Sequence, residues 1–263
     1  MRKWLALVVL CLPAAYGQTP VVAAGGVLNA ASNARNQGVA PGGLISIYGS
    51  ELAASLQQAS SVPLSTQLGD VSVTVNDVAA PLTLVSAGQI NAQLPWNVLA
   101  DPNTAATVNL IVRRGNTVSA ATQVRIEPFA PGIFSTQFGV GQAISINLDG
   151  SLTAAAGAIP GIATKPGKAG DVIILLVTGL GAVDQPVANG ARPTVLTNTV
   201  NKPAVLIGGV EAPVLFSGLA PEFPGVYQMN VQIPQGVPVG NAVSIQIRMG
   251  SITSTDQVTI AIQ

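Results

Sequence analysis

The segment Gln89-Ile90-Asn91-Ala92-Gln93-Leu94-Pro95 recurs later in the chain as Gln228-Met229-Asn230-Val231-Gln232-Ile233-Pro234. Both copies read Q-x-N-x-Q-x-P, with amide side chains at alternate positions and apolar side chains between them. This period of two predicts a β-strand that has one polar face and one apolar face. Simple alternation recurs easily by chance, but this combination of amides and proline does not, so the repeat indicates a duplicated domain.

Two more pairs of segments occur in the same order before this repeat. Pro41 to Gly49 corresponds to Ala169 to Gly179, and Val73 to Pro81 corresponds to Val205 to Pro213. The copies lie roughly 130–140 residues apart, which is the size of a domain and not of a solenoid repeat. The second copy is longer at Gly218 to Gly225, where we expect a loop insertion.

The rest of the chain also has the pattern of strands. Apolar and polar residues alternate over Val71 to Asn76, Val243 to Met249 and Gln257 to Ile262. Val172 to Val177 is apolar throughout, which predicts a strand buried on both faces. Turn residues interrupt the chain about every 8–12 residues, and long helical periodicity is absent, so we expect an all-β fold. Hairpin turns are expected at Asn76-Asp77, Arg114-Gly115-Asn116, Asp149-Gly150 and Gly208-Gly209.

These elements divide the chain into five parts. We expect a signal peptide at 1–17, an N-terminal segment at 18–40 that packs on the first sandwich, a first sandwich at 41–128, a connector at 129–168 and a second sandwich at 169–263. Within the connector, Ala143 to Leu148 and Ser151 to Thr153 are predicted to pair as a small hairpin across Asp149-Gly150. The residues that follow, up to Gly170, are rich in Ala, Gly and Pro and are typical of a linker.

The first residues have the pattern of a secretory signal. Arg2 and Lys3 precede the apolar stretch Trp4 to Leu12, which is too short to span a bilayer. Ala15-Tyr16-Gly17 then places small residues where a signal peptidase cleaves, and an uncleaved N-terminal anchor is the alternative. Cleavage would remove Cys11, so the mature chain would contain no thiol for a disulfide, a metal site or nucleophilic catalysis. We expect no membrane span in the mature chain.

The composition excludes several kinds of function. Charged residues make up 8% of the chain, eleven basic residues balance eleven acidic ones, and there is no His. The charge balance argues against a nucleic-acid partner. Without His, a Ser-His-Asp triad is excluded and the commonest metal ligand is missing. The acidic residues are scattered singly and mostly at turns, and the only mature lysines, Lys165, Lys168 and Lys202, lie beside Pro or Gly. We therefore expect no enzyme, no catalytic residues, no metal and no cofactor.

Two groups of side chains are candidates for binding, although no ligand can be assigned. Trp96, Phe134, Phe138 and Phe223 could stack on a ligand if exposed, and packing against a neighbouring domain is the alternative. The Gln and Asn residues of Q-x-N-x-Q-x-P are either the outer polar face of a strand or a hydrogen-bonding surface. Gly179-Leu180-Gly181 is read as a strand-to-turn transition that needs positive φ, because it lacks the pattern of a phosphate-binding loop.

The succession G-x-x-I-x-I-x-G, V-x-V-N-x-x-x-A-P and Q-I-N-x-Q-x-P is similar to immunoglobulin-like IPT/TIG modules, and the similarity covers both halves. More closely, the chain after residue 17 resembles the Solibacter-type uncharacterised C-terminal domain family of acidobacterial secreted proteins. The resemblance implies paired immunoglobulin-like β-sandwiches in an exported protein, and it implies no activity. The segments that carry it are Gly26 to Ser32, Val39 to Gly43, Gln89 to Trp96, Ala130 to Phe134, Asn147 to Ser151, Thr178 to Gly181 and Tyr227 to Pro234.

Together these features predict tandem immunoglobulin-like, IPT/TIG-like β-sandwiches with a connecting β-hairpin. The expected function is that of a non-catalytic secreted or cell-surface module for binding, adhesion or structure, with an extracellular protein or polysaccharide as the unidentified partner. The alternative is a carbohydrate-binding module that acts alongside extracellular hydrolases. The periplasm is the alternative location.

Overall fold

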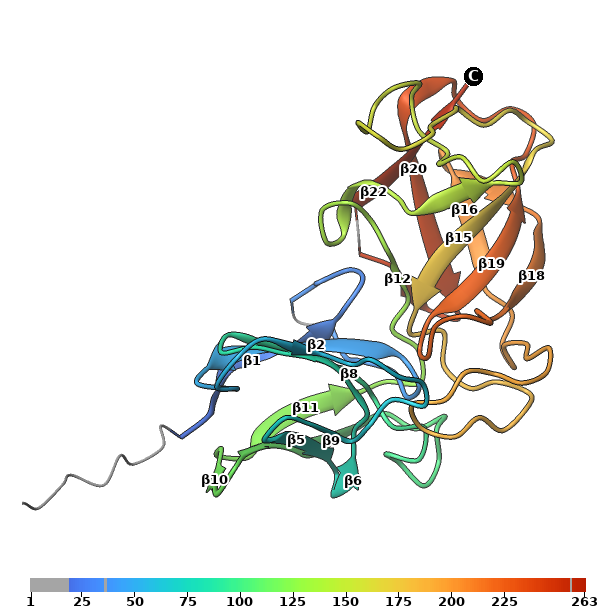
Figure 1. Cartoon of the computed structure of the whole chain (residues 1–263). Coiled ribbons are helices and arrows are strands. Elements are labelled where there is room, and N and C mark those ends of the chain that lie inside the picture. The colour runs from blue at the N-terminus through green and yellow to red at the C-terminus, as the bar shows by residue number, and fades with distance from the viewer. Residues whose placement is uncertain (1–18, 36, 256) are drawn as a thin grey trace, which may run out of the picture.

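The computed structural model describes residues 19–35, 37–255 and 257–263. Every regular element within these ranges is a β-strand, and the strands form four sheets. Figure 1 shows two lobes, each made of one half of the chain, that are set at an angle to one another. The expected signal peptide at 1–17 lies outside the described residues.

The first half forms one sandwich of two sheets. Its strands are β1 (Val21–Asn29), β2 (Leu44–Ser50), β3 (Gln57–Gln58), β4 (Gln67–Leu68), β5 (Val71–Val75), β6 (Val78–Ala79), β7 (Leu82–Val85), β8 (Gln89–Gln93), β9 (Ala106–Arg114), β10 (Thr117–Val118) and β11 (Thr122–Ile126). One sheet has the order β1-β2-β8-β7-β3. The other has the order β10-β9-β5-β4, with β11 paired to β9 and β6 paired to β5.

The second half forms the other sandwich. Its strands are β12 (Gly132–Ile133), β13 (Val140–Gln142), β14 (Ser145–Asn147), β15 (Val172–Thr178), β16 (Ala204–Ile207), β17 (Val210–Ala212), β18 (Val214–Leu219), β19 (Tyr227–Gln232), β20 (Gly240–Met249), β21 (Ile252–Thr253) and β22 (Gln257–Ile262). One sheet has the order β12-β15-β19-β18, with β14 also paired to β15. The other has the order β13-β22-β20-β16-β17, with β21 paired to β20.

The two halves share one pattern of strand pairing. β8 lies between β2 and β7 in the first half, as β19 lies between β15 and β18 in the second. In the facing sheets, β9 pairs with β5, β10 and β11, and β20 pairs with β16, β21 and β22. A β-bulge between Leu82 and Leu84 has its counterpart between Val214 and Phe216. This is the connectivity that a duplicated domain predicts, with Q-x-N-x-Q-x-P as β8 and β19.

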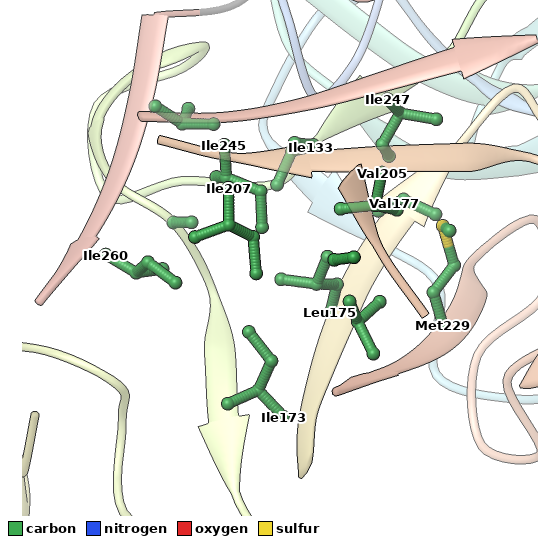
Figure 2. Packing of buried hydrophobic residues seen from close by; sticks show 14 of the residues in the cluster. Ile133, Ile173, Leu175, Val177, Val205, Ile207, Met229, Ile245, Ile247 and Ile260 are labelled. Atoms are coloured by element: carbon green, nitrogen blue, oxygen red, sulfur yellow. The ribbon is translucent and has the colours of Figure 1, made fainter. Parts of the chain in front are cut away.

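Side-chain alternation places one face of each strand in a core. β5 alternates between buried and half-buried residues, and every second residue of β19 is buried. In the second sandwich, Ile173 and Leu175 of β15 lie opposite Ile207 of β16 and Ile245 of β20, as Figure 2 shows. Full burial of such a side chain contributes about 1.5–3 kcal/mol to folding. The first sandwich has an equivalent core.

The expected hairpins form with the geometry that their residues favour. Asn76 and Asp77 have φ of 48° and 63° between β5 and β6, and Gly208 and Gly209 have φ of 56° and 82° between β16 and β17. Positive φ at both central residues is characteristic of type I′ turns, which match the twist of the flanking strands. The turn at Asp149-Gly150 is closed by Asn147 N, which donates to Ser151 O at 2.8 Å.

The structure differs from the expected domain organisation at two places. Residues 129–168 are not a separate connector: β12 and β14 pair with β15, and β13 pairs with β22, so the second sandwich already begins near Gly132. Ile133 and Ala143 are buried in its core. The backbone pairing of β12 and β14 with β15 closes a sheet edge that would otherwise be open. Residues 18–40 do more than pack on the first sandwich, since β1 is an edge strand of its sheet.

A third difference concerns the strand expected to be buried on both faces. Along β15, buried residues alternate with half-buried ones until Val177 and Thr178, so only one face lies in the core. Ile174 and Leu176 are apolar residues of the other, half-buried face. Continuous apolar sequence therefore does not distinguish a strand covered on both faces from one that is partly shielded by a neighbouring segment.

Two serines stabilise equivalent hairpins, β9–β10 and β20–β21, through a hydrogen bond to a backbone N–H. We expect their replacement to have equal effects on the free energy of unfolding. Ser119 Oγ accepts a hydrogen bond from Val112 N at 3.0 Å, and Ser254 Oγ accepts one from Ile247 N at 3.1 Å, with both serines buried. Ser119→Ala and Ser254→Ala should each lower the free energy of unfolding by about 1–2 kcal/mol, because a buried N–H loses its partner. Urea unfolding measures this, and wild-type stability of either variant would contradict the equivalence.

Candidate functional site

The two sandwiches are joined by buried hydrogen bonds around Gln93, Trp96, Asn189 and Gly190, which we call the Gln93 joint. The Gln93 side chain, at the end of β8, is fully buried. Its Nε2 donates to Gly42 O at 3.1 Å, and its Oε1 accepts from Gly190 N at 2.6 Å. Gly190 lies in the loop between β15 and β16, so this single amide connects both halves of the chain. Gly190 O also accepts from Leu64 N at 2.8 Å.

Thr178 makes a second polar connection between the sandwiches. Its side chain is fully buried at the end of β15. The Oγ1 atom accepts a hydrogen bond from Leu44 N at 2.8 Å and donates one to Gly225 O at 2.7 Å. One hydroxyl thus satisfies a backbone donor of the first sandwich and a backbone acceptor of the second.

Trp96 packs in the joint. Its ring lies edge-on to that of Tyr227, with ring centroids 6.5 Å apart, and its backbone N donates to Asn189 Oδ1 at 2.8 Å. The Tyr227 hydroxyl donates to Gly181 O at 2.5 Å, and burial raises the pKa of Tyr227 well above its usual range, so the phenol stays a neutral donor. A Cβ atom at Gly42 would overlap the Trp96 ring. The sequence allowed Trp96 either to stack on a ligand or to pack against a neighbouring domain. In the structure its ring packs between the two halves of the chain.

The three phenylalanines named from the sequence have different environments. Phe223 is 56% exposed in the loop between β18 and β19, at the expected insertion. Phe138 is 68% exposed and has φ of 49°, in the loop between β12 and β13. Phe134 is half-buried in the same loop. Exposed rings of this kind are available to stack on a ligand.

The repeated Gln and Asn residues form an equivalent pair in each half. Gln89 Nε2 donates to Asn91 Oδ1 at 2.8 Å, and Gln228 Nε2 donates to Asn230 Oδ1 at 2.8 Å. Each pair lines a pocket on the outer face of its sheet. We call them the first and second amide pockets, with volumes of about 220 and 470 Å³. The first also includes Ser46, Thr83, Phe134 and Phe138, and the second includes Val195, Leu196, Phe216 and Pro221.

The sequence located the amide pairs and Phe134 and Phe138, but not the other parts of these sites. Phe216 lies in β18 beside β19 and was not distinguishable from a core residue by its alternation. The loop that carries Val195 and Leu196 has no regular structure, and their exposure of 60% and 74% depends on how that loop lies on the sheet. Asn189 and Gly190 had no signal beyond being typical turn residues.

One ion pair at the surface involves a lysine named from the sequence. Lys165 Nζ lies 2.8 Å from Asp149 Oδ2, and Ser151 Oγ donates to Asp149 Oδ1 at 2.6 Å. The hydrogen bond from Lys165 lowers the pKa of Asp149 well below its usual range, and the same bond raises the pKa of Lys165. A lysine held protonated in this way is unsuited to act as the base of a Ser–Lys dyad. No cluster of three or more potential metal-ligating residues occurs within the described ranges.

The ion pair between Asp149 and Lys165 predicts a dependence of stability on pH. Because the pKa of Asp149 is lower in the folded state, its contribution is complete above the ordinary value of 3.8 and decreases as the pH falls below it. We expect the wild type to lose stability between pH 5 and roughly 2 more steeply than Asp149→Asn does. Thermal unfolding at several pH values measures the difference, and parallel profiles would contradict it.

The remaining sequence expectations concern the backbone and the membrane. Gly179 and Gly181 have φ of 79° and 78° directly after β15, as expected for a strand-to-turn transition. The part of the chain that the structure describes contains no helix with the length and apolar character needed to cross a membrane.

Comparisons with known proteins give one domain match. Residues 34–126 match the IPT/TIG domain family. No curated protein matches the chain. Among solved structures, domains 5–6 of the S-layer protein SbsC share 12% identity at a TM-score of 0.27, over 93% of this chain and 98% of that one. The titin I9–I11 tandem shares 12% at a TM-score of 0.20, over 94% and 67%. The C-terminal domain of the Streptococcus agalactiae AgI/II polypeptide BspA shares 9% at 0.20, over 93% and 99%. None of these structural likenesses extends to function.

Proposed function

We propose that the protein is a non-catalytic module of the cell exterior, which binds or assembles with other surface components through a rigid pair of immunoglobulin-like sandwiches. The observation that carries this proposal is the Gln93 joint. Buried hydrogen bonds from Gln93 and Thr178 connect the sandwiches directly, so the two lobes keep a fixed orientation. A fixed orientation of the two lobes suits a spacer, or a scaffold that presents one binding face on each lobe at the same time.

Export is proposed from the first residues of the chain. The pattern at 1–17 is that of a signal peptide. The chain after it contains no Cys, so it has no thiol that would be sensitive to an oxidising exterior. The resemblance of the sequence motifs to the Solibacter-type family of secreted proteins is part of this proposal and implies the same location. The periplasm is the second compartment that a signal of this kind allows.

A non-catalytic role is proposed from the chemistry of the polar groups. Asp149 and Lys165 neutralise each other at the surface, and the pairs Arg192–Glu222 and Arg248–Glu211 are also solvent-exposed. The first and second amide pockets have no charged lining residue to act as acid, base or nucleophile. Hydrogen bonding and stacking are what such walls can offer a partner.

One edge strand offers a route for assembly. β1 lies at the end of its sheet, and Val21 to Gly25, which carry no charge, are largely exposed. Edge strands without charged residues can pair with a strand of another chain. In the second sandwich the corresponding edge of β15 is paired with β12 and β14. The opposite edge, at β18, is also covered, because Thr199 N donates to Ser217 O at 2.9 Å and Leu219 N donates to Thr197 O at 3.0 Å.

The proposal is tested by binding to native envelope. The tagged protein, expressed without residues 1–17, is incubated with intact cell envelope of the source organism, and retained components are identified after cross-linking. We expect saturable retention of a protein or a polysaccharide. A protein that is strictly monomeric in gel filtration and is not retained by envelope would overturn the proposal.

A carbohydrate-binding module that acts alongside extracellular hydrolases is the second candidate. The observation that favours it is the presence of an amide pair in a pocket in each half, with an aromatic ring beside it.

A further inference from the structure

We infer that the first and second amide pockets are equivalent binding sites for acetamido sugars, so that the chain holds an uncharged N-acetylated glycan at two points. This inference rests on the proposed function as an extracellular binding module and names its ligand class. It is carried by the internal duplication, because the two halves keep the same pair of amides in a pocket while their other pocket residues differ.

The polar atoms of each pair define the complementary group. Gln Nε2 and Asn Oδ1 bond to each other, which leaves Gln Oε1 as an acceptor and Asn Nδ2 as a donor without protein partners among the described residues. If both amides were turned over, one donor and one acceptor would still remain. A ligand must therefore present an acceptor and a donor close together. The acetamido group does this with its C=O and N–H.

The pocket walls fit the rest of an acetamido sugar. Val195, Leu196 and Phe216 make the second pocket largely apolar, and Ala30, Ala31 and Leu44 do the same in the first. Such walls accommodate the acetyl methyl group and the apolar face of a pyranose ring. No charged side chain lines either pocket, which favours an uncharged ligand over an acidic one.

Phe138 supplies an independent reason to assign a ligand to the first pocket. Its ring is 68% exposed, and its backbone has φ of 49°, a conformation that is strained for a bulky residue. The loop is fixed by Gly139, whose N donates to Ser135 Oγ at 2.8 Å and where a Cβ atom would overlap Ser32 O. A rigid loop that holds an exposed ring beside Gln89 and Asn91 provides a stacking platform.

A peptide ligand is less favoured by the second pocket. An extended peptide usually gains affinity by pairing with an open strand edge. The edge of β18 that borders this pocket is already paired with Thr197 and Thr199. Recognition here depends on side-chain amides and apolar walls.

The test is a calorimetric titration of the protein without residues 1–17 with three probes: chitohexaose, cellohexaose and a capped Thr-Val-Thr-Val-Thr peptide. We expect chitohexaose to bind and cellohexaose to bind at least roughly tenfold more weakly, because glucose lacks the acetamido group. Equal binding of both sugars, binding of the peptide alone, or no binding of any probe would overturn the inference. Retention on envelope protein with no sugar binding would leave the proposed function intact.

The variants separate the two pockets. Asn91→Asp and Asn230→Asp keep the acceptor for the neighbouring Gln but remove the free donor and add a charge. Each should reduce the number of chitohexaose sites or weaken binding at least roughly tenfold, and the double variant should abolish binding. Asn109→Asp is the control, since Gln123 Nε2 donates to Asn109 Oδ1 at 2.6 Å on an exposed sheet face outside both pockets. Unchanged binding in the double variant, with folding verified by circular dichroism, would refute the assignment.

Discussion

Gly179→Ala should lower the free energy of unfolding by at least about 3 kcal/mol, which is a large effect for one methyl group. A Cβ atom there would overlap the backbone oxygen of Ala130, and no side-chain rotation can relieve a contact with backbone. Ala130 N donates to Gly179 O at 2.9 Å, and Ala130 O accepts from Asn29 Nδ2 at 2.7 Å. The methyl group would therefore disturb the passage of the chain from the first sandwich to the second.

Gly161→Ala is the matched control for this variant. Gly161 has φ of 77°, close to the 79° of Gly179, but a Cβ atom there would meet nothing within 4 Å. Its substitution reports only the conformational strain of Ala at positive φ, roughly 1 kcal/mol. Guanidinium unfolding of both variants measures the difference. Equal losses of stability would mean that the contact with Ala130 contributes nothing.

Local pattern in the sequence was sufficient to predict the all-β fold and the duplication. Alternation located the core faces of β5, β19 and β20, and Asn76-Asp77 and Gly208-Gly209 located their hairpins. These features depend on residues close together in the chain. Where a strand edge is covered by a distant segment, as β15 is by β12 and β14, the pairing partner cannot be inferred from the strand itself.

In the two amide pockets, the amide pairs could be predicted from neighbouring residues of the sequence, but the surrounding walls could not. The amide pairs follow from the period of two, because residues two apart on a strand share a face. The strained backbone of Phe138 and the loop that places Val195 and Leu196 over β19 depend on packing between distant segments. The identity of the walls around each pair was therefore not accessible from the motif.

Gln93 and Gln232 show how one motif position acquires two roles. Both are the last Gln of Q-x-N-x-Q-x-P. Gln93 is fully buried between Gly42 and Gly190, whereas Gln232 is half-buried at the sheet surface and its Nε2 donates only to Gly170 O at 3.1 Å. The difference arises because the loop with Gly190 reaches the end of β8 and gives Gln93 Oε1 a second partner.

Gln93→Ala should accordingly lower the free energy of unfolding by about 2–4 kcal/mol, because it leaves Gly42 O and Gly190 N buried without partners. Gln232→Ala should change stability by less than about 1 kcal/mol. Gln93→Met, which keeps the volume but not the hydrogen bonds, should resemble Gln93→Ala if the polar contacts are decisive. Urea unfolding gives the energies, and small-angle X-ray scattering should show a broader range of lobe orientations for the Gln93 variants alone. Equal effects at the two positions, or wild-type scattering from Gln93→Ala, would show that the lobes are held by something other than this amide.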